Sequence, residues 1–310
     1  MRRLWALFRQ WLSREHVICL GAIVLCALLS AGTGILDGSA PVAFPQTLSI
    51  PEIGDGLITD PVRTADYRAA RMIQSYQYLR EIARGHGSIL WDPTEFGGTP
   101  FLAAWDTRVF SPFSVPFYLF DIRVAVHIAA ILKVLTAGVL AYYVGRVLGL
   151  GHPFSLFVAI AHGLSATLTV WTIDPASDTA VWVPLLFLFA ERVSLSQHRY
   201  WPAGALVIGA MLFSGAPQAV VSSFVFFAMY FQLRRRVDTV REFVAPILTA
   251  LAAIILLSAL AAAQLWPYFE WLANSKPVWA QGETGPGPRA LFLLFGPLTG
   301  LSDTDPAAAP

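Results

Sequence analysis

Residues 90–100 read Leu90-Trp91-Asp92-Pro93-Thr94-Glu95-Phe96-Gly97-Gly98-Thr99-Pro100, and they lie in a polar, aromatic-rich insert from about Asp37 to Arg123. The insert follows a first apolar stretch and precedes a series of others. Connections of this length are uncommon and are usually functional or disordered. This one has too many aromatic residues and too little repetitive sequence to be disordered. We therefore expect an ordered external cap that carries the chemistry of the protein.

The composition outside the insert is that of a membrane protein. Of 310 residues, 56% are hydrophobic and only 13% are charged, and the mean hydropathy is +0.59, whereas a soluble domain has roughly 25% charged residues. The sequence predicts an all-α polytopic membrane protein with about seven transmembrane helices, because about 20 apolar residues cross a bilayer. The candidate spans are Val17–Leu36, Val124–Arg146, Phe154–Thr172, Thr179–Ser194, Trp201–Ser214, Gln218–Leu233 and Phe243–Trp266.

The distribution of charge predicts the orientation. If the N-terminus is cytoplasmic, most charged residues in the short segments on that side are arginines, and the acids of the insert all lie outside. Basic residues accumulate in cytoplasmic loops, so we expect the N-terminus inside and the C-terminus outside. The arginines on the cytoplasmic side are Arg2, Arg3, Arg9, Arg14, Arg146, Arg192, Arg199, Arg234, Arg235, Arg236 and Arg241.

The spans and the orientation together divide the chain into five parts. We expect a basic cytoplasmic N-terminus (1–16), an uncleaved transmembrane anchor (17–36), an external loop with the candidate active site (37–123), a six-helix transmembrane region (124–266) and an external C-terminal tail (267–310). The anchor is favoured over a cleaved signal peptide because its apolar run is longer than that of a typical signal.

One segment of the external loop has the periodicity of a short amphipathic helix. Between Asp66 and Arg84, apolar residues recur at steps of three or four and form one stripe, which Arg80 interrupts. Asp60-Pro61 is a candidate helix start, and Thr64 or Asp66 is an alternative cap. A helix of this kind lies at a membrane surface with its arginines near phosphate groups. The stripe consists of Ala69, Ile73, Tyr76, Leu79 and Ala83.

Several motifs, taken in order, resemble a known family. The segment Asp66–Gly85, the runs Leu90-Trp91-Asp92-Pro93 and Phe96-Gly97-Gly98-Thr99-Pro100, and Val109-Phe110-Ser111-Pro112 resemble the first external loop of the YfhO-like bacterial membrane proteins. These proteins belong to the wider GT-C class of polytopic glycosyltransferases. The resemblance covers roughly Asp60 to Ser275 and returns at Ser214-Gly215-Ala216-Pro217-Gln218 and Gln264-Leu265-Trp266-Pro267.

The resemblance implies a function and a location. It implies transfer of a sugar from a polyprenyl-phosphate donor to a cell-envelope acceptor, on the outer face of a bacterial cytoplasmic membrane. In GT-C enzymes an acidic residue of the first external loop usually acts as the base or activates the acceptor. By its position relative to Trp91, Asp66 is the best match to that acid, and Asp60 is the second.

Glycosyl transfer also needs positive groups near the leaving phosphate. The candidates that bind the donor phosphate are Arg63, Arg68, Arg71 and Arg123, because guanidinium binds phosphate through two hydrogen bonds. The alternative for Asp66 and its neighbouring arginines is a helix cap with solvated charges.

Five further residues are candidates to line the substrate site: His86, Trp91, Asp92, Glu95 and Lys133. The alternative interpretation of His86 is an exposed histidine in a loop without a functional role. The alternative for Trp91 is an anchor at the membrane interface. Lys133 falls inside the second span, where a charge is unfavourable and often functional, and it would meet either a lipid phosphate or a buried acid.

We expect no cofactor, although Asp55 and Asp60 leave a divalent metal ion open as a less favoured alternative. The expected partners are the lipid bilayer, the polyprenyl-phosphate-linked sugar and a membrane protein that completes the fold, with no nucleic acid. The last expectation comes from length: family members are longer, so we expect this chain to be a fragment, part of a split gene or a reduced relative. A non-catalytic accessory or assembly subunit is the alternative function. A transporter or flippase component is the third, which the lack of an inverted repeat disfavours.

Overall fold

The computed structural model describes residues 14–31, 64–94, 97–169, 171–194, 201–234 and 262–274. These residues are mostly helical and contain no strand, apart from one isolated bridge between Asp92 and Thr99. The all-α class is therefore confirmed for the described part of the chain. The elements are α2 (Arg14–Ala31), α4 (Thr64–Ala83), η1 (Trp105–Thr107), η2 (Pro112–Ser114), α5 (Val115–Leu119), α6 (Ile122–Val147), α7 (His152–Gly163), α8 (Ala166–Thr169), α9 (Pro175–Ser194), α10 (Trp201–Leu212), α11 (Pro217–Arg234) and α13 (Ala262–Asn274).

Within the described residues, two helices are long and apolar enough to cross a membrane, judged by length and composition alone. They are α2, with 18 residues, and α6, with 26 residues. Helices α7 and α10 have 12 residues each, which is shorter than the ~20 residues of a full span. Helix α9 has 20 residues but includes Asp178, Glu191 and Arg192. The first two expected spans thus coincide with helices of sufficient length.

Other expected spans have different boundaries in the structure. The span predicted over Phe154–Thr172 is divided, because α7 ends at Gly163 and the short α8 begins after the turn at Ser165. The span predicted to end at Ser214 ends at Leu212, where the chain turns through Gly215 with a φ of +84°. Residues 243–261 lie outside the described part, and α13 continues beyond Trp266, where the external tail was expected to begin.

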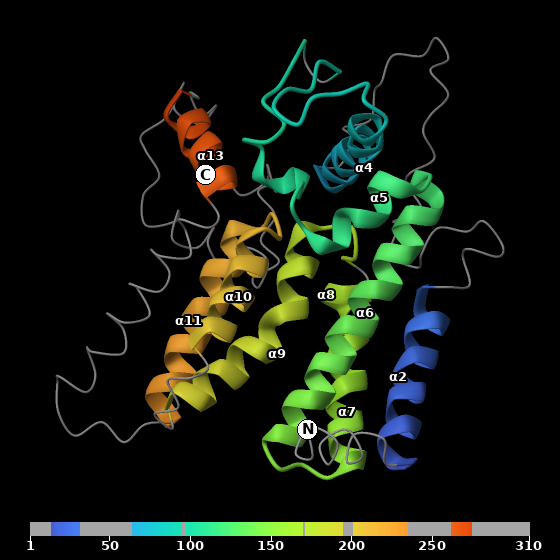
Figure 1. Ribbon diagram of the computed structural model, residues 1–310, viewed down its shortest axis with the longest axis vertical. Helices are drawn as coiled ribbons and strands as arrows, with labels where there is room; N and C mark the ends of the chain where they lie inside the picture. The colour runs from blue at the N-terminus through green and yellow to red at the C-terminus, as the bar shows by residue number, and fades with distance from the viewer. Residues whose placement is uncertain are drawn as a thin grey trace, which may run out of the picture.

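The long helices lie side by side, with α6 in contact with α2, α7 and α9, and α9 in contact with α10 and α11 (Figure 1). Small residues allow the close approach of α6 and α7, as in many membrane helix pairs. A Cβ atom on Gly163 would lie 3.2 Å from the carbonyl oxygen of Val134, and one on Gly138 would lie 2.8 Å from a methyl group of Ile23 in α2. These glycines bring three helices into contact at one level.

A small polar cluster joins α2 to the turn between α6 and α7. The Tyr142 hydroxyl and Nδ1 of His152 are 2.8 Å apart, and Nε2 of His152 lies 3.1 Å from a carboxylate oxygen of Glu15. The ring of His16 packs edge-on against that of His152, with centroids 4.5 Å apart. The cluster lies at the end of the bundle opposite the insert.

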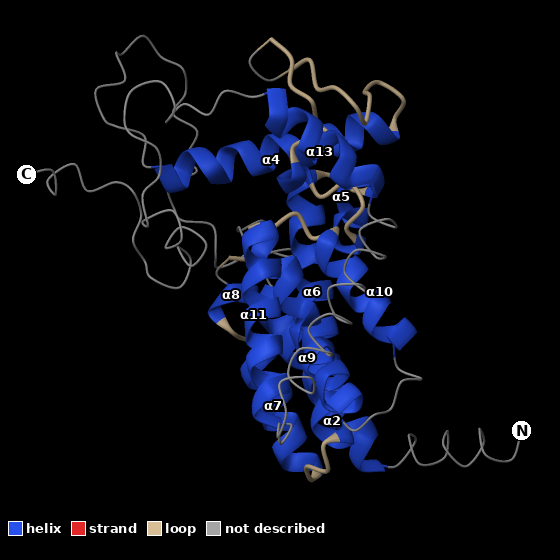
Figure 2. Ribbon diagram, turned by 90° about the vertical axis from the view of Figure 1, so that its left-hand side faces the viewer, coloured by secondary structure: helices blue, strands red, loops and turns tan. Residues whose placement is uncertain are grey.

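The described part of the insert forms a separate layer across the other end of the bundle. Figure 2 shows α4 lying across the ends of the long helices. Met72, Tyr76 and Leu79 are buried against the loop that carries Phe101 and against Phe117 of α5. The predicted stripe is correct at Tyr76 and Leu79.

The buried face of α4 is wider than the predicted stripe. The Tyr78 hydroxyl donates to the carbonyl oxygen of Trp91 at 2.8 Å, which buries Tyr78 beneath the loop that follows the helix. Ala83, the last residue of the stripe, is exposed. The predicted stripe includes only the face of α4 that packs toward the bundle. Sequence periodicity does not show that the following loop folds back over a second face of the helix.

The layer and the turn between α6 and α7 lie at opposite ends, which gives a test of orientation. Cysteine placed at Ser88 in the insert should react with a membrane-impermeant thiol reagent in intact cells, whereas cysteine placed at Leu150 should react only after permeabilisation. Both positions are exposed, so solvent access to the side chain does not explain a difference. The unsubstituted chain controls for Cys19 and Cys26. Labelling of the Leu150 position alone would contradict the proposed orientation.

Candidate functional site

A buried cluster of charges joins the insert to the bundle. Asp178, in the first turn of α9, has a fully buried side chain. The side chain of Arg108 in the insert is also fully buried, and that of Lys133 in α6 is 1% exposed. One carboxylate oxygen of Asp178 lies 2.6 Å from Nη1 of Arg108 and 2.6 Å from Nζ of Lys133. The other oxygen accepts a hydrogen bond from the Ser111 hydroxyl at 2.5 Å. One carboxylate therefore connects three segments that are distant in the sequence.

Lys133 has its full set of hydrogen-bond partners. Besides contacting Asp178, its ammonium group donates to the carbonyl oxygen of Thr172 at 2.5 Å and to the hydroxyl of Ser177 at 2.8 Å. An ammonium group has three donors, and all three are used. Of the two alternatives for Lys133, the lipid phosphate and the buried acid, the structure has the buried acid.

Arg108 occupies an unusual backbone conformation at the centre of this cluster. Its φ of +53° lies in the left-handed region, and its guanidinium carbon lies 4.5 Å from the centre of the Tyr76 ring. Burial alone would lower the pKa of Arg108, but the attraction of Asp178 raises that pKa above its ordinary value. A Cβ atom on Gly215 would lie 2.5 Å from Cγ of Arg108, so only glycine leaves room for this side chain.

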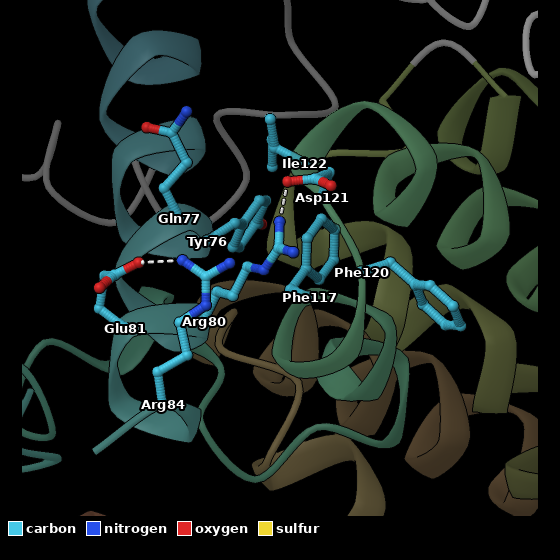
Figure 3. A pocket seen from close by; sticks show the side chains of 9 residues that line it. All are labelled: Tyr76, Gln77, Arg80, Glu81, Arg84, Phe117, Phe120, Asp121 and Ile122. Atoms are coloured by element: carbon cyan, nitrogen blue, oxygen red, sulfur yellow. Dashed lines mark hydrogen bonds and ion pairs between the residues drawn. The ribbon is translucent and has the colours of Figure 1, made fainter. Parts of the chain in front are cut away.

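Above the cluster, α4, α5 and the start of α6 enclose a pocket of about 240 Å³. Figure 3 shows Arg80 between the rings of Tyr76 and Phe117 and directed at Asp121, and Arg84 beside Glu81. Arg80 forms an ion pair with Asp121, and Nη1 of Arg84 lies 3.0 Å from Oε1 of Glu81. The lining residues are Tyr76, Gln77, Arg80, Glu81, Arg84, Phe117, Phe120, Asp121 and Ile122.

Tyr76 connects the pocket to the cluster beneath it. One face of its ring stacks on Phe117 in the pocket wall, with centroids 4.3 Å apart, and the guanidinium of Arg108 also packs against the ring. Its hydroxyl donates to the carbonyl oxygen of Ile173 at 2.7 Å. Burial raises the pKa of Tyr76 well above its ordinary value, so the hydroxyl stays protonated and keeps this bond. Tyr76 therefore packs against both the pocket wall and the charged cluster.

The predicted catalytic acids lie away from this pocket or outside the described residues. Asp60, and with it the predicted phosphate ligand Arg63, is outside the described part of the chain, as is Glu95. Asp66 and Arg68 lie in the first turns of α4, where the structure describes the backbone only. Because a helix rises about 1.5 Å per residue, Asp66 is about 21 Å along the axis from Arg80.

The other two predicted phosphate ligands also lie outside the pocket. Nη1 of Arg71 lies 3.6 Å from a carboxylate oxygen of Asp106. Arg123 is exposed in the first turn of α6. None of the predicted site residues whose side chains are described is among those that line the pocket.

The remaining predicted residues belong to the loop after α4. Asp92 is 2% exposed, and one of its oxygens accepts hydrogen bonds from the amide and the hydroxyl of Thr94 at 2.8 and 2.6 Å, so its carboxylate stabilises the loop itself. Trp91 is half exposed and covers Gly98, where a Cβ atom would lie 2.5 Å from its ring. His86 is exposed, with Nδ1 3.4 Å from Glu81.

The sequence contained signals for some of the residues it did not select. Arg80 interrupts an apolar stripe, which indicates a charge with a partner or a ligand. Lys133 inside a span requires an acid, and the first turn of α9 supplies Asp178 on the same side of the bundle as the insert. Nothing in the local sequence around Arg108 indicates that its side chain reaches α9.

The described residues contain no group of three or more histidine, cysteine or acidic side chains able to hold a metal ion. Comparison with family models, with curated proteins and with solved structures finds no match to this chain. The resemblance to the YfhO-like proteins therefore stays a prediction.

The charged cluster makes a prediction about stability. Asp178→Asn removes the carboxylate that contacts both Arg108 and Lys133, so it should reduce the free energy of unfolding by about 3–5 kcal/mol, as expected when a buried ion pair loses one partner. The matched control is Asp106→Asn, which breaks the partly exposed pair with Arg71 and should change stability by less than about 1 kcal/mol. Denaturant unfolding in detergent micelles measures both. Equal effects would contradict the central role of Asp178.

Proposed function

We propose that the chain is a GT-C-type membrane glycosyltransferase, which transfers a sugar from a polyprenyl-phosphate donor to a cell-envelope acceptor at the outer face of a bacterial cytoplasmic membrane. The proposal includes seven spans, with the N-terminus inside and the insert outside. The observation that carries it is the pocket, which is lined both by Arg80 and Arg84 and by the aromatic side chains of Tyr76, Phe117 and Phe120. Guanidinium groups bind phosphate with good geometry, and the aromatic wall suits an adjoining hydrocarbon.

The surroundings of the pocket also suit a lipid-linked substrate. Helix α5, which forms one wall, and the residue that follows it expose apolar side chains: Val115 is 49%, Leu119 65% and Phe120 43% exposed. In the proposed topology α5 lies at the level of the outer membrane interface, where aromatic and apolar residues accumulate. An isoprenoid chain leaving the pocket along α5 would stay in an apolar environment.

The size of the pocket limits what it would hold. Ligand pockets usually measure roughly 300–1,000 Å³, and this one is about 240 Å³. It would therefore hold the phosphate group with the atoms bonded to it, while most of the isoprenoid chain lies outside.

The position of the donor phosphate constrains the choice of catalytic acid. A general base must be within hydrogen-bond reach of the proton it takes, and Asp66 is about 21 Å along α4 from Arg80. A phosphate between Arg80 and Arg84 is consistent with Glu81 as the acid, because Glu81 lines the same pocket. A phosphate between Arg68 and Arg71 is consistent with Asp66. The two arrangements exclude each other.

Donor binding distinguishes these arrangements. With labelled polyprenyl-phosphate sugars in membranes, Arg80→Ala should raise the KM for the donor at least about tenfold, because a charge-assisted hydrogen bond contributes about 1.5–3 kcal/mol. Arg80→Lys should recover part of this loss. Arg71→Ala, which lies outside the pocket, should leave the KM for the donor nearly unchanged. The opposite pattern would place the phosphate at Arg68 and Arg71.

The carboxylates are tested in the same assay. Loss of a general base lowers the rate by roughly 10²–10⁴-fold. If the pocket holds the donor, Glu81→Gln should reduce kcat by at least about 100-fold while Asp66→Asn retains activity. The reverse result would favour Asp66, as the resemblance implies. A wild-type chain that is inactive with every donor would favour the non-catalytic accessory function.

A further inference from the structure

The charges inside the pocket balance one another. Two cations, Arg80 and Arg84, face two anions, Glu81 and Asp121, and each guanidinium has one carboxylate partner. A site that only had to attract highly charged anions would have an excess of positive charge. This pocket instead contains two carboxylates that compete with any bound phosphate.

Asp121 is held in place by the helix that it begins. It is the N-cap residue of α6, and its backbone oxygen accepts the hydrogen bond of Ala125 at 2.8 Å. Aspartate at this position commonly caps the helix with its side chain, but the Asp121 side chain makes no such bond and pairs with Arg80. The carboxylate is therefore directed at the pocket and not at the helix end, and its backbone anchor keeps it there when a ligand enters.

The ion pairs are weak enough for a ligand to open them. The side chain of Asp121 is 76% exposed and that of Glu81 is 41% exposed, and exposed pairs of this kind contribute little to stability. An incoming phosphate gains two guanidinium partners, but it remains close to both carboxylates. Each further negative charge on the ligand increases the attraction to the arginines and the repulsion from the carboxylates together, so the balanced pocket gives little net attraction to offset the desolvation of that charge.

We infer that Asp121 is a specificity-determining residue, which restricts the pocket to lipids with a single, singly charged phosphate and excludes lipid diphosphates. This inference rests on the proposed function, because it names the charge class of the donor that the proposed site accepts. A phosphodiester, such as an isoprenoid phosphate esterified to a sugar, has one negative charge to share between Arg80 and Arg84. A diphosphate brings additional charge against Asp121 and Glu81.

Binding of two matched lipids tests the inference. Farnesyl methyl phosphate, a phosphodiester, and farnesyl diphosphate have the same hydrocarbon chain and differ in charge. The full chain in detergent should bind the phosphodiester more tightly. Asp121→Asn should improve the binding of the diphosphate relative to the phosphodiester by about two- to fivefold, since one exposed like charge is removed from the site. Asparagine is also a favourable N-cap residue, so α6 should remain intact.

Two controls separate a local effect from a general change in charge. Asp106→Asn makes the same change in the insert outside the pocket, and it should leave the ratio of the two dissociation constants unchanged. Arg80→Ala should weaken the binding of both lipids. The inference is overturned if wild type prefers the diphosphate, if neither lipid binds, or if Asp121→Asn and Asp106→Asn change the ratio equally.

The binding assay and the transfer assay distinguish failure of the role of Asp121 from failure of the proposed glycosyltransferase activity. A chain that shows the selectivity and its loss in Asp121→Asn, but transfers no sugar, would retain Asp121 as the specificity residue of a lipid-phosphate site and refute the glycosyltransferase. A chain that transfers sugar, but whose preference does not depend on Asp121, would retain the enzyme and refute the role of Asp121.

Discussion

The carboxylate of Asp178 lies 2.6 Å from the ammonium group of Lys133 in α6 and 2.6 Å from the guanidinium group of Arg108 in the insert. The Asp178 side chain is not exposed to solvent. Two cations so close together in a buried site repel each other strongly unless an anion lies between them. The position of the insert on the bundle therefore depends on this acid. The hydroxyl of Ser111 completes the arrangement by donating to its second oxygen.

The pocket depends on the same cluster through Tyr76. Its ring lies against Arg108 on one side and Phe117 on another, and its hydroxyl bonds to the loop that leads into α9. Arg80 follows Tyr76 by one helical turn of α4, so its side chain faces the same region. The buried ion cluster and the pocket thus share one aromatic side chain.

The two groups of charges differ in what surrounds them. In the cluster, burial removes water, so each charge requires a permanent partner, and Asp178 serves both cations. In the pocket, Asp121 and Glu81 are substantially exposed, so their pairs with arginine exchange readily with solvent or ligand. The first set is suited to holding the insert, and the second is suited to binding an anion reversibly. Only the exposed set is therefore a reasonable place for substrate.

The sequence alone determined the helical class of the described residues, two apolar helices of sufficient length and the amphipathic helix in the insert, because hydrophobic content and helical periodicity are local properties. It also indicated that Lys133 needed a partner. It favoured Asp66 at one end of α4 as the candidate acid, whereas the pocket lies around Arg80 near the other end. Only the tertiary structure brought Asp178 to Arg108 and Asp121 to Arg80, because such pairs depend on how the chain folds back, which local pattern does not encode.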